Sequence, residues 1–219
     1  AIGYKVHDSC VRVETQKGSI KADRLILACN GYLGTLEKRL TSKILPMNNY
    51  IVATEPLGDE IVRKINPRDI AFADSRFVIN YFRLSADKRL LFGGGENYSK
   101  ELSNNIVPIV TKPLEKIYPF LKGVKIDYAW GGKLAITMNR LPFFTTLYND
   151  KVISAQGYSG QGVALASYSG KIVSEKITGD GKTFDIMSRI PRQSFPGGRF
   201  LRNPSMKIGM LYYSLLDRI

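Results

Sequence analysis

The sequence is poor in the side chains on which metal sites and hydrolytic triads depend. Among 219 residues it has one histidine, His7, and two cysteines, Cys10 and Cys29. A zinc cage, a Cys-His nucleophile pair and a Ser-His-Asp triad all draw on these residue types, so no metal site is expected. Two unpatterned cysteines give no disulfide framework, which fits a reducing, cytoplasmic location. Chemistry must therefore come from a cofactor or from other side chains.

Acidic residues and long apolar runs are also scarce. Lys and Arg number 32 against 19 Asp and Glu, a formal net charge of +13. The basic residues are scattered and no nucleic-acid-binding motif accompanies them, and such an excess is usually a solvated face. No eighteen-residue apolar run exists, so no membrane span is predicted. The expectation is a globular protein that binds a small molecule and no nucleic acid.

Patterns of strands fill the first two thirds of the chain. Residues 4–6, 11–15 and 19–22 alternate like a small β-meander, whereas residues 25–29 form an apolar run typical of a parallel strand buried on both faces. Aromatic and β-branched residues indicate a mixed or antiparallel sheet further on, with a hairpin turn at residues 85–88. The strands of that sheet are predicted at residues 49–54, 77–83, 89–93 and 125–136, and helices at residues 104–121 and 206–219.

The most informative element is a strand, a glycine-rich turn and a helix. Residues 151–155 are apolar, residues 157–162 read Gly-Tyr-Ser-Gly-Gln-Gly, and residues 162–177 have helical spacing with many small side chains. Glycines let a ligand approach bare backbone, and a helix N-terminus favours an anionic or electron-rich group. A tight turn that only lets the helix pack closely is the alternative.

Two other glycine-containing stretches are ambiguous. Residues 179–183 end like a phosphate-binding P-loop, but Lys176 stands where that motif has glycine, and the stretch follows a helix and not a strand. Trp130, Gly131 and Gly132 lie in a strand pattern, where glycine marks a bulge or a close-approaching ligand. A tight turn explains them equally well.

Six ordered blocks together resemble a known family. They are residues 22–32, 53–57, 81–85, 130–132, 139–142 and 157–163, and the tail at residues 195–202 adds to them. In this order they resemble the D-amino-acid-oxidase-type FAD-dependent oxidoreductases, most closely the gamma-glutamylputrescine oxidoreductase-like branch, of which the chain would be a C-terminal portion.

The resemblance implies an α+β or α/β fold. A partial FAD-binding three-layer domain (residues 1–44 and 141–219) would be interleaved with a mostly antiparallel substrate-domain sheet (residues 45–140). It also implies the residues that bind FAD: Cys29, Asn30, Gly31, Trp130, Gly131, Gly132, Gly157, Tyr158, Ser159, Gly160, Gln161, Gly162 and Val163. The glycine-rich turn would offer backbone N–H groups to the pyrimidine edge of the flavin.

Departures from the family pattern qualify these implications. The Gly-x-Gly-x-x-Gly turn that binds the FAD pyrophosphate does not occur in this sequence, so the missing N-terminal half is an expected partner and the isolated chain is expected to bind FAD weakly or not at all. No cysteine stands near Gly131, which implies noncovalent FAD. Sarcosine-oxidase-like relatives carry a lysine for oxygen reactivity near the position of the apolar Leu91, so an oxidase and a dehydrogenase both stay open.

The resulting hypothesis is oxidation of the C–N bond of an amine or amino acid by hydride transfer to flavin. Tyr50, Tyr81 and Arg83 are candidates for the substrate face, with ordinary sheet packing and a surface cation as the alternative. Two other functions stay open. One is a non-catalytic partner-binding or regulatory module without flavin, and the other is a basic protein that touches a membrane through residues 189–202 and its terminal helix.

Overall fold

The computed structural model describes residues 1–76, 79–97, 99, 101–196, 204 and 208. It divides into two compact units: unit 1 is built on Ala1–Pro46 and Leu134–Ser205, and unit 2 on Met47–Lys133. Helices and antiparallel sheets occur together, which confirms the predicted mixed α and β fold. The predicted terminal helix at residues 206–219 lies outside the described residues, apart from Ile208.

Unit 1 begins with the predicted meander. It comprises β1 (Gly3–Val6), β2 (Val11–Thr15) and β3 (Gly18–Ala22) in antiparallel register. Val6 pairs with Val11 across the first turn, and Thr15 pairs with Gly18 across the second. The alternation of apolar and polar residues was therefore sufficient to place all three strands.

The second sheet of unit 1 joins two strands that are far apart in the sequence. Its order is β10 (Phe143–Leu147), β11 (Val152–Gln156) and β4 (Leu25–Leu27). β11 and β10 form an antiparallel hairpin, and β11 runs parallel to β4 with Val152 opposite Leu25. β4 and β11 were both predicted, whereas β10 was not.

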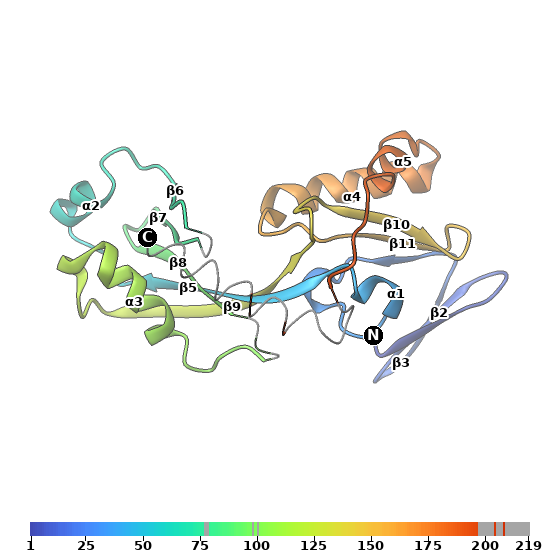
Figure 1. Ribbon diagram of the computed structural model, residues 1–219, viewed down its shortest axis with the longest axis horizontal. Coiled ribbons are helices and arrows are strands. Elements are labelled where there is room, and N and C mark those ends of the chain that lie inside the picture. Colours follow the sequence, from blue (N-terminus) through green and yellow to red (C-terminus); the bar gives the residue numbers. More distant parts are fainter. Residues whose placement is uncertain (77–78, 98, 100, 197–203, 205–207, 209–219) are drawn as a thin grey trace. The chain divides into compact units, whose positions relative to one another are not determined.

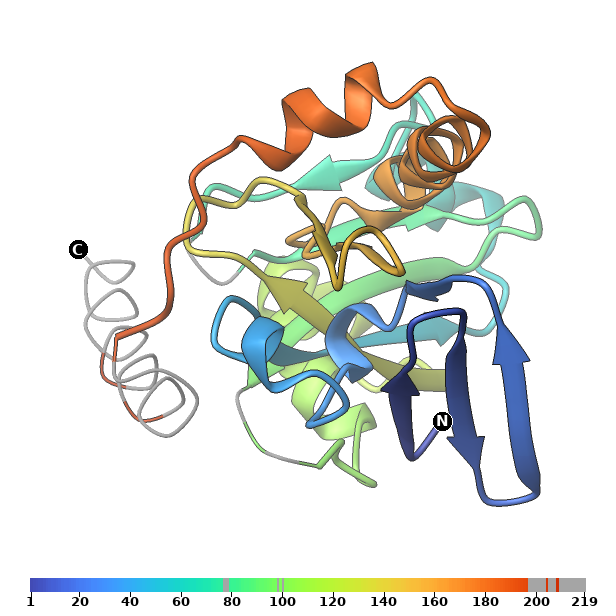
Figure 2. The same cartoon turned by 90° about the vertical axis from the view of Figure 1, so that its right-hand side faces the viewer.

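This second sheet is the middle of three layers (Figures 1 and 2). On one face, α4 (Gly162–Thr178) and α5 (Lys182–Ser188) pack on it through Ile172, Val173 and Phe184. The opposite face carries Leu27 and Val152 and is covered by the meander, η1 (Asn30–Tyr32) and α1 (Lys38–Thr41). The three-layer arrangement predicted for the FAD-binding part is thus present in unit 1.

The prediction that the strand at residues 25–29 is buried on both faces is wrong in this structure. Ile26 is 47% exposed, whereas its neighbour Leu27 is buried. The reason is that β4 forms the edge of the described sheet, and on one of its faces an open groove separates it from α4.

A short helix, α5, follows α4 where the sequence indicated no element. Gly179 ends α4 with a left-handed φ of 110°, and Gly181 begins α5. The P-loop-like residues 179–183 thus comprise the turn between two helices and the first two residues of α5. Phe184 is buried against Phe144, which explains why this short helix is held in place.

Unit 2 is built on a five-stranded sheet. Its order is β6 (Phe72–Ala73), β7 (Tyr81–Leu84), β8 (Leu90–Asn97), β5 (Leu45–Thr54) and β9 (Ile126–Ile136). One face packs on α3 (Val107–Ile117) and η2 (Pro119–Leu121), and α2 (Asp59–Ile65) joins the same core. The core has Tyr50, Val52 and Phe92 on the sheet and Val110 and Leu114 on α3, all fully buried.

The predicted strand at residues 77–83 is shorter in the structure. Phe77 and Val78 lie outside the described residues, and β7 begins only at Tyr81. Asn80 is held instead by Asp74, which accepts one hydrogen bond from the Asn80 backbone and another from its side chain. The predicted helix at residues 104–121 is likewise divided into α3 and η2, with Pro108 in the first turn and Pro113 inside α3.

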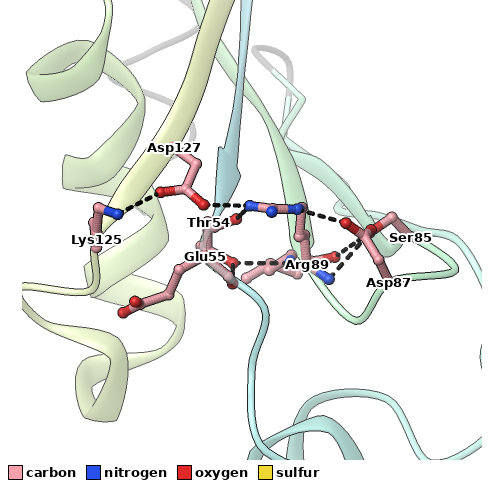
Figure 3. A network of polar contacts seen from close by, with 8 residues as sticks. Thr54, Glu55, Ser85, Asp87, Arg89, Lys125 and Asp127 are labelled. Atoms are coloured by element: carbon pink, nitrogen blue, oxygen red, sulfur yellow. Dashed lines mark hydrogen bonds and ion pairs between the residues drawn. The ribbon is translucent and has the colours of Figure 1, made fainter.

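A polar network fixes one end of the unit 2 sheet (Figure 3). The Arg89 guanidinium donates to Asp127 Oδ2 at 2.5 Å, to Asp87 Oδ2 at 2.6 Å and to the Thr54 carbonyl at 2.8 Å. It thereby connects the hairpin turn between β7 and β8 with the ends of β5 and β9. Hydrogen bonds from Arg89 and from Lys125 lower the pKa of the Asp127 carboxyl.

A second polar network, in unit 1, fixes the segment that follows Asn30 and Gly31. The Glu37 carboxylate is 6% exposed and accepts two hydrogen bonds from the Arg39 guanidinium at 3.0 Å and another from the Tyr4 hydroxyl. The Arg39 guanidinium lies 4.3 Å from the centre of the Tyr148 ring. Hydrogen bonds from Arg39 lower the pKa of Glu37 from 4.5 to about 2.

We expect Glu37→Gln to destabilise unit 1 by roughly 3 kcal/mol at pH 7, because the Arg39 guanidinium would lose its counter-charge. A carboxyl whose folded pKa is lowered contributes stability above its unfolded pKa and loses it as the pH falls through the folded value. The stability difference between wild type and variant should therefore shrink between about pH 4.5 and pH 2. Urea unfolding measured across that range checks this, with Tyr4→Phe as a control that removes one hydrogen bond. A difference independent of pH would show that Glu37 has an ordinary pKa.

Candidate functional site

The parallel pairing of β4 with β11 brings two predicted site segments together. Both strands end at the same edge of the sheet, where Asn30 and Gly31 follow β4 and the glycine loop (residues 157–163) follows β11. The Gly157 N–H donates to Asn30 Oδ1 at 3.1 Å. Residues 127 positions apart in the sequence therefore form one continuous surface at the carboxyl edge of the sheet.

The backbone of the glycine loop is held in an unusual conformation. Gly157 has a φ of 79°, Ser159 of 50° and Gly160 of 95°, all in the left-handed region. The Ser159 N–H donates to the Ala135 carbonyl at 2.9 Å, and the Ser159 hydroxyl accepts from the Thr137 N–H at 3.2 Å. The loop is thus held by residues at and after the end of β9.

Gly157 and Gly160 are required for different reasons. A Cβ at Gly157 would lie 2.6 Å from the Thr137 methyl carbon, so both its φ and its packing exclude a side chain. A Cβ at Gly160 would meet no atom within 4 Å, so that position faces open space. Bare backbone at an open position is what close approach of a planar ligand needs, whereas a turn that serves packing alone would be enclosed.

The first turn of α4 is exposed beside this loop. Gln161 is its N-cap residue, and the Gln161 side chain makes no capping hydrogen bond. Val163, in the first turn, is 98% exposed although it is apolar. The N-terminus of a helix carries partial positive charge and N–H groups that lack helical partners. This end of α4 can therefore stabilise negative charge on a bound group.

An open groove of about 590 Å³ lies between β4 and α4. Small or apolar side chains line it on both sides, and Tyr158 and Gly162 form its end nearest the glycine loop. Its other lining residues are Ile26, Ala28, Asn30, Ala155, Ala166, Ser169, Gly170, Val173, Ser174 and Ile177. The start of α4 thus borders a cleft and is not packed against protein.

Sequence reasoning missed one polar residue at this edge, Gln156. Its side chain is fully buried, and neither Nε2 nor Oε1 has a hydrogen-bond partner among the described residues. A polar residue that ends an apolar strand, directly before a glycine loop, was the signal that could have found it. The open backbone at Gly160 and the uncapped helix fit a flat, polar-edged ligand such as the isoalloxazine of FAD.

The surroundings of Cys29 and Tyr158 indicate that both residues have structural roles. Burial raises the pKa of the Cys29 thiol, so this cysteine is not an activated thiolate. The Tyr158 hydroxyl donates to the Ala155 carbonyl at 3.0 Å and thereby closes the first turn after β11.

The predicted residues Trp130, Gly131 and Gly132 belong to unit 2. β9 runs continuously through them, so they form no turn. A Cβ at Gly131 would lie 2.6 Å from the ring of Tyr50, which gives this glycine a packing role. Trp130 is 44% exposed.

The three substrate-face candidates lie on two faces of the unit 2 sheet. Tyr50 is fully buried in the core beneath α3, and its hydroxyl accepts from the Ser103 N–H at 3.0 Å. The Tyr81 ring lies on the opposite face, where its hydroxyl donates to Asn49 Oδ1 at 2.5 Å. Arg83 is two residues from Tyr81 on the same strand, shares that face and is exposed. The structure therefore groups Tyr81 with Arg83 and separates both from Tyr50.

No group of three or more His, Cys, Asp and Glu side chains that could hold a metal ion occurs in the part of the chain that the structure describes. Within the same residues, no helix combines the length and apolar character that crossing a bilayer requires.

We expect Gly157→Ala to lower the unfolding free energy by about 2–4 kcal/mol, because left-handed strain and the contact with Thr137 add together. Gly34→Ala is the matched control, since Gly34 has a φ of 56° and its nearest neighbour to an added Cβ is 3.9 Å away. The Gly34→Ala substitution should lower the free energy of unfolding by only about 1 kcal/mol. Adding Thr137→Ser to Gly157→Ala should restore part of the loss in chemical denaturation. Equal losses at the two glycines would mean that Thr137 does not restrict the loop.

Comparison with known proteins supplies the family. Residues 2–176 match the FAD dependent oxidoreductase (DAO) family. Gamma-glutamylputrescine oxidoreductase of Escherichia coli (strain K12) is 38% identical over 214 residues, which are 97% of this chain and 50% of that protein. The chain therefore spans about half the length of the curated relatives it matches.

Solved structures share the fold. Glycine oxidase from Bacillus cereus ATCC 14579 superposes with a TM-score of 0.65 at 16% identity, over 87% of this chain and 52% of that one. L-proline dehydrogenase from P. horikoshii superposes with a TM-score of 0.63 at 22% identity, over 80% of this chain and 48% of that one. At such identities the likeness concerns the fold alone. The match to the family model covers most of this chain, residues 2–176, and shows that the chain belongs to the FAD dependent oxidoreductase (DAO) family.

Proposed function

We propose that this protein oxidises the C–N bond of an amine or amino acid by hydride transfer to a noncovalently bound FAD. The observation that carries the proposal is the parallel pairing of β4 with β11, which aligns Asn30 with an open glycine loop at the uncapped start of α4. That arrangement presents backbone N–H groups and a positive helix end to a single flat ligand.

The described residues of unit 1 would hold the pyrimidine edge of the flavin. Gly160 leaves its backbone open, and the N-terminus of α4 would stabilise the negative charge that the ring carries near N1 and C2=O when reduced. Noncovalent binding is proposed because Trp130, Gly131 and Gly132 offer no thiol. FAD, when bound, supplies the hydride acceptor.

The substrate would meet the face of the unit 2 sheet that carries Tyr81 and Arg83. The substrate amine must be neutral for its α-carbon to release hydride, and apolar surroundings lower the pKa of an amine. The exposed Arg83 guanidinium suits a substrate carboxylate. Tyr50, on the opposite face of the sheet, would support this face by packing against Gly131. The resulting imine is hydrolysed by water to a carbonyl compound and an amine or ammonia.

The groove beside β4 is proposed to receive the dinucleotide-binding half of the same protein. Ile26 is 47% exposed at the edge of a parallel sheet, and parallel sheets are normally covered on both faces and paired at their inner strands. The segment would be an apolar strand that pairs with β4, followed by a helix that packs on the small residues of α4. Without it, these 219 residues would bind FAD weakly.

A cytoplasmic location is proposed because Cys10 and Cys29 are both free thiols. The second candidate function is a non-catalytic module that uses this fold half without flavin. It is favoured by the networks around Glu37 and Arg89, which connect elements of each unit through residues of this chain alone.

Expression together with the proposed dinucleotide-binding half should give a yellow protein. We expect the absorption bands of oxidised flavin, bleached anaerobically by amines such as gamma-glutamylputrescine, and release of free FAD on denaturation in acid. The 219 residues expressed alone should be colourless. A colourless longer protein that is folded and monodisperse would contradict the flavoenzyme and support the non-catalytic module.

The role of the groove can be tested with a pair of exposed isoleucines in unit 1. Ile26→Glu should reduce flavin incorporation into the longer protein, because a carboxylate would be buried beside β4. Ile20→Glu is the matched control, since Ile20 is 61% exposed on the meander and should tolerate the charge. In the 219-residue chain alone, neither substitution should lower the free energy of unfolding by more than about 0.5 kcal/mol. Equal incorporation in the two variants would exclude docking on this groove.

A further inference from the structure

A second groove in unit 1 runs along β10, at the other edge of the sheet from β4. It is open and has a volume of about 650 Å³. The strand order β10-β11-β4 puts β10 and β4 at the two edges of the described sheet. The dinucleotide-binding half is proposed to pair at β4, so the groove along β10 would remain accessible in the longer protein.

Four cationic side chains line this groove from two sides. α1 and the turn after it supply Arg39 and Lys43, whereas the end of α5 and the segment after it supply Arg189 and Arg192. No described Asp or Glu side chain lines it, and we call it the basic groove. Its other lining residues are Leu40, Phe143, Thr145, Leu147, Ser188, Ile190 and Pro191.

Three of the four cations are held in place by the chain itself. The Lys43 ammonium donates to the Arg192 carbonyl at 3.1 Å, and one nitrogen of the Arg192 guanidinium donates to the Thr145 hydroxyl at 2.7 Å. Arg39 donates to the Glu37 carboxylate through Nε and Nη2. An ammonium has three N–H donors and a guanidinium has five, so each of these groups has donors left for a bound anion.

The charge in the basic groove is not balanced by described carboxylates. Lys43, Arg189 and Arg192 form no ion pair with a described residue, whereas Lys176, on the other face of the same sheet, pairs with two carboxylates at 3.1 and 3.5 Å. A single exposed cation is ordinarily solvated. Several cations in one concave site attract anions more strongly, because the low-dielectric walls focus their field.

We propose that the basic groove binds a small oxyanion of the phosphate type that carries two or more negative charges. Guanidinium groups bind phosphate oxygens through paired N–H donors, and an ammonium adds a compact charge. The anion would connect α1 with the segment after α5, which the hydrogen bond from the Phe195 N–H to the Ser42 carbonyl already joins at 3.1 Å. The inference does not rest on the FAD function, because no lining residue belongs to the proposed flavin site.

The test is calorimetric titration of inorganic pyrophosphate into the longer protein that includes the proposed dinucleotide-binding half, with FAD present and in about 0.15 M NaCl. Wild type should bind one equivalent. Arg189→Gln should weaken binding about tenfold, because it removes a charge-assisted hydrogen bond. The Arg189 side chain is exposed and bonds to no described residue, so its replacement should leave folding intact. Arg192→Gln is the second variant and should also weaken binding about tenfold.

Arg12→Gln is the matched control, because Arg12 is an exposed cation on β2 that does not line the basic groove. It makes the same change of net charge and should alter the affinity by less than about twofold. Thermal unfolding supplies an independent readout. At one pyrophosphate concentration, the unfolding temperature should rise more in wild type and in Arg12→Gln than in Arg189→Gln.

A lipid surface can also present phosphate groups, so co-sedimentation with phosphatidylglycerol vesicles forms a second arm. Binding to vesicles without binding of pyrophosphate would mean that the cations meet a surface, and it would overturn the groove site. The absence of saturable pyrophosphate binding, or equal losses in Arg189→Gln and Arg12→Gln, would overturn it as well.

Further outcomes separate this inference from the proposed function. Displacement of pyrophosphate by FAD, with unchanged affinity in Arg189→Gln, would place the anion in the flavin site and overturn the inference alone. A longer protein that binds pyrophosphate through Arg189 but takes up no FAD would support the basic groove and contradict the flavoenzyme.

Discussion

The parallel pairing of β4 with β11 is the interaction on which the site depends. Three register pairs, from Leu25 opposite Val152 to Leu27 opposite Ser154, align the carboxyl ends of strands from opposite ends of the sequence. Because parallel strands end at the same edge, the residues after each strand meet there. The hydrogen bond from the Gly157 N–H to Asn30 is the direct consequence. Loss of this register would separate the two segments that form the carboxyl edge.

Residues of the surrounding structure hold the candidate site in place. Ala135 and Thr137, at and after the end of β9, hold Ser159, and the Thr137 methyl group excludes a side chain from Gly157. The Glu37–Arg39–Tyr4 network fixes the chain that follows η1. Backbone donors placed in this way need no reorganisation when charge develops on a bound group, which is the physical basis of electrostatic preorganisation.

Glycines serve opposite purposes in the two units. In unit 1, Gly160 faces open space, as a position approached by a ligand requires. In unit 2, a Cβ at Gly93 would lie 2.1 Å from the Tyr81 ring and one at Gly131 would lie 2.6 Å from the Tyr50 ring, so both glycines make room for aromatic side chains. A glycine in a sequence signals close approach, but the approaching group is visible only in three dimensions.

The sequence by itself determined the elements whose signals are local. The meander, β11 and α4 follow from the period of the apolar residues and from the turn glycines, and six ordered blocks indicated the family. Only the tertiary structure decided which strands are neighbours, that Ile26 is exposed at a sheet edge, that Tyr50 and Tyr81 lie on opposite faces, and that the Gln156 amide is unpaired. α5 and β10 were missed because their apolar residues gain stability from tertiary contacts, such as that between Phe144 and Phe184. Burial and pairing are set by residues distant in the chain, and local patterns do not contain that information.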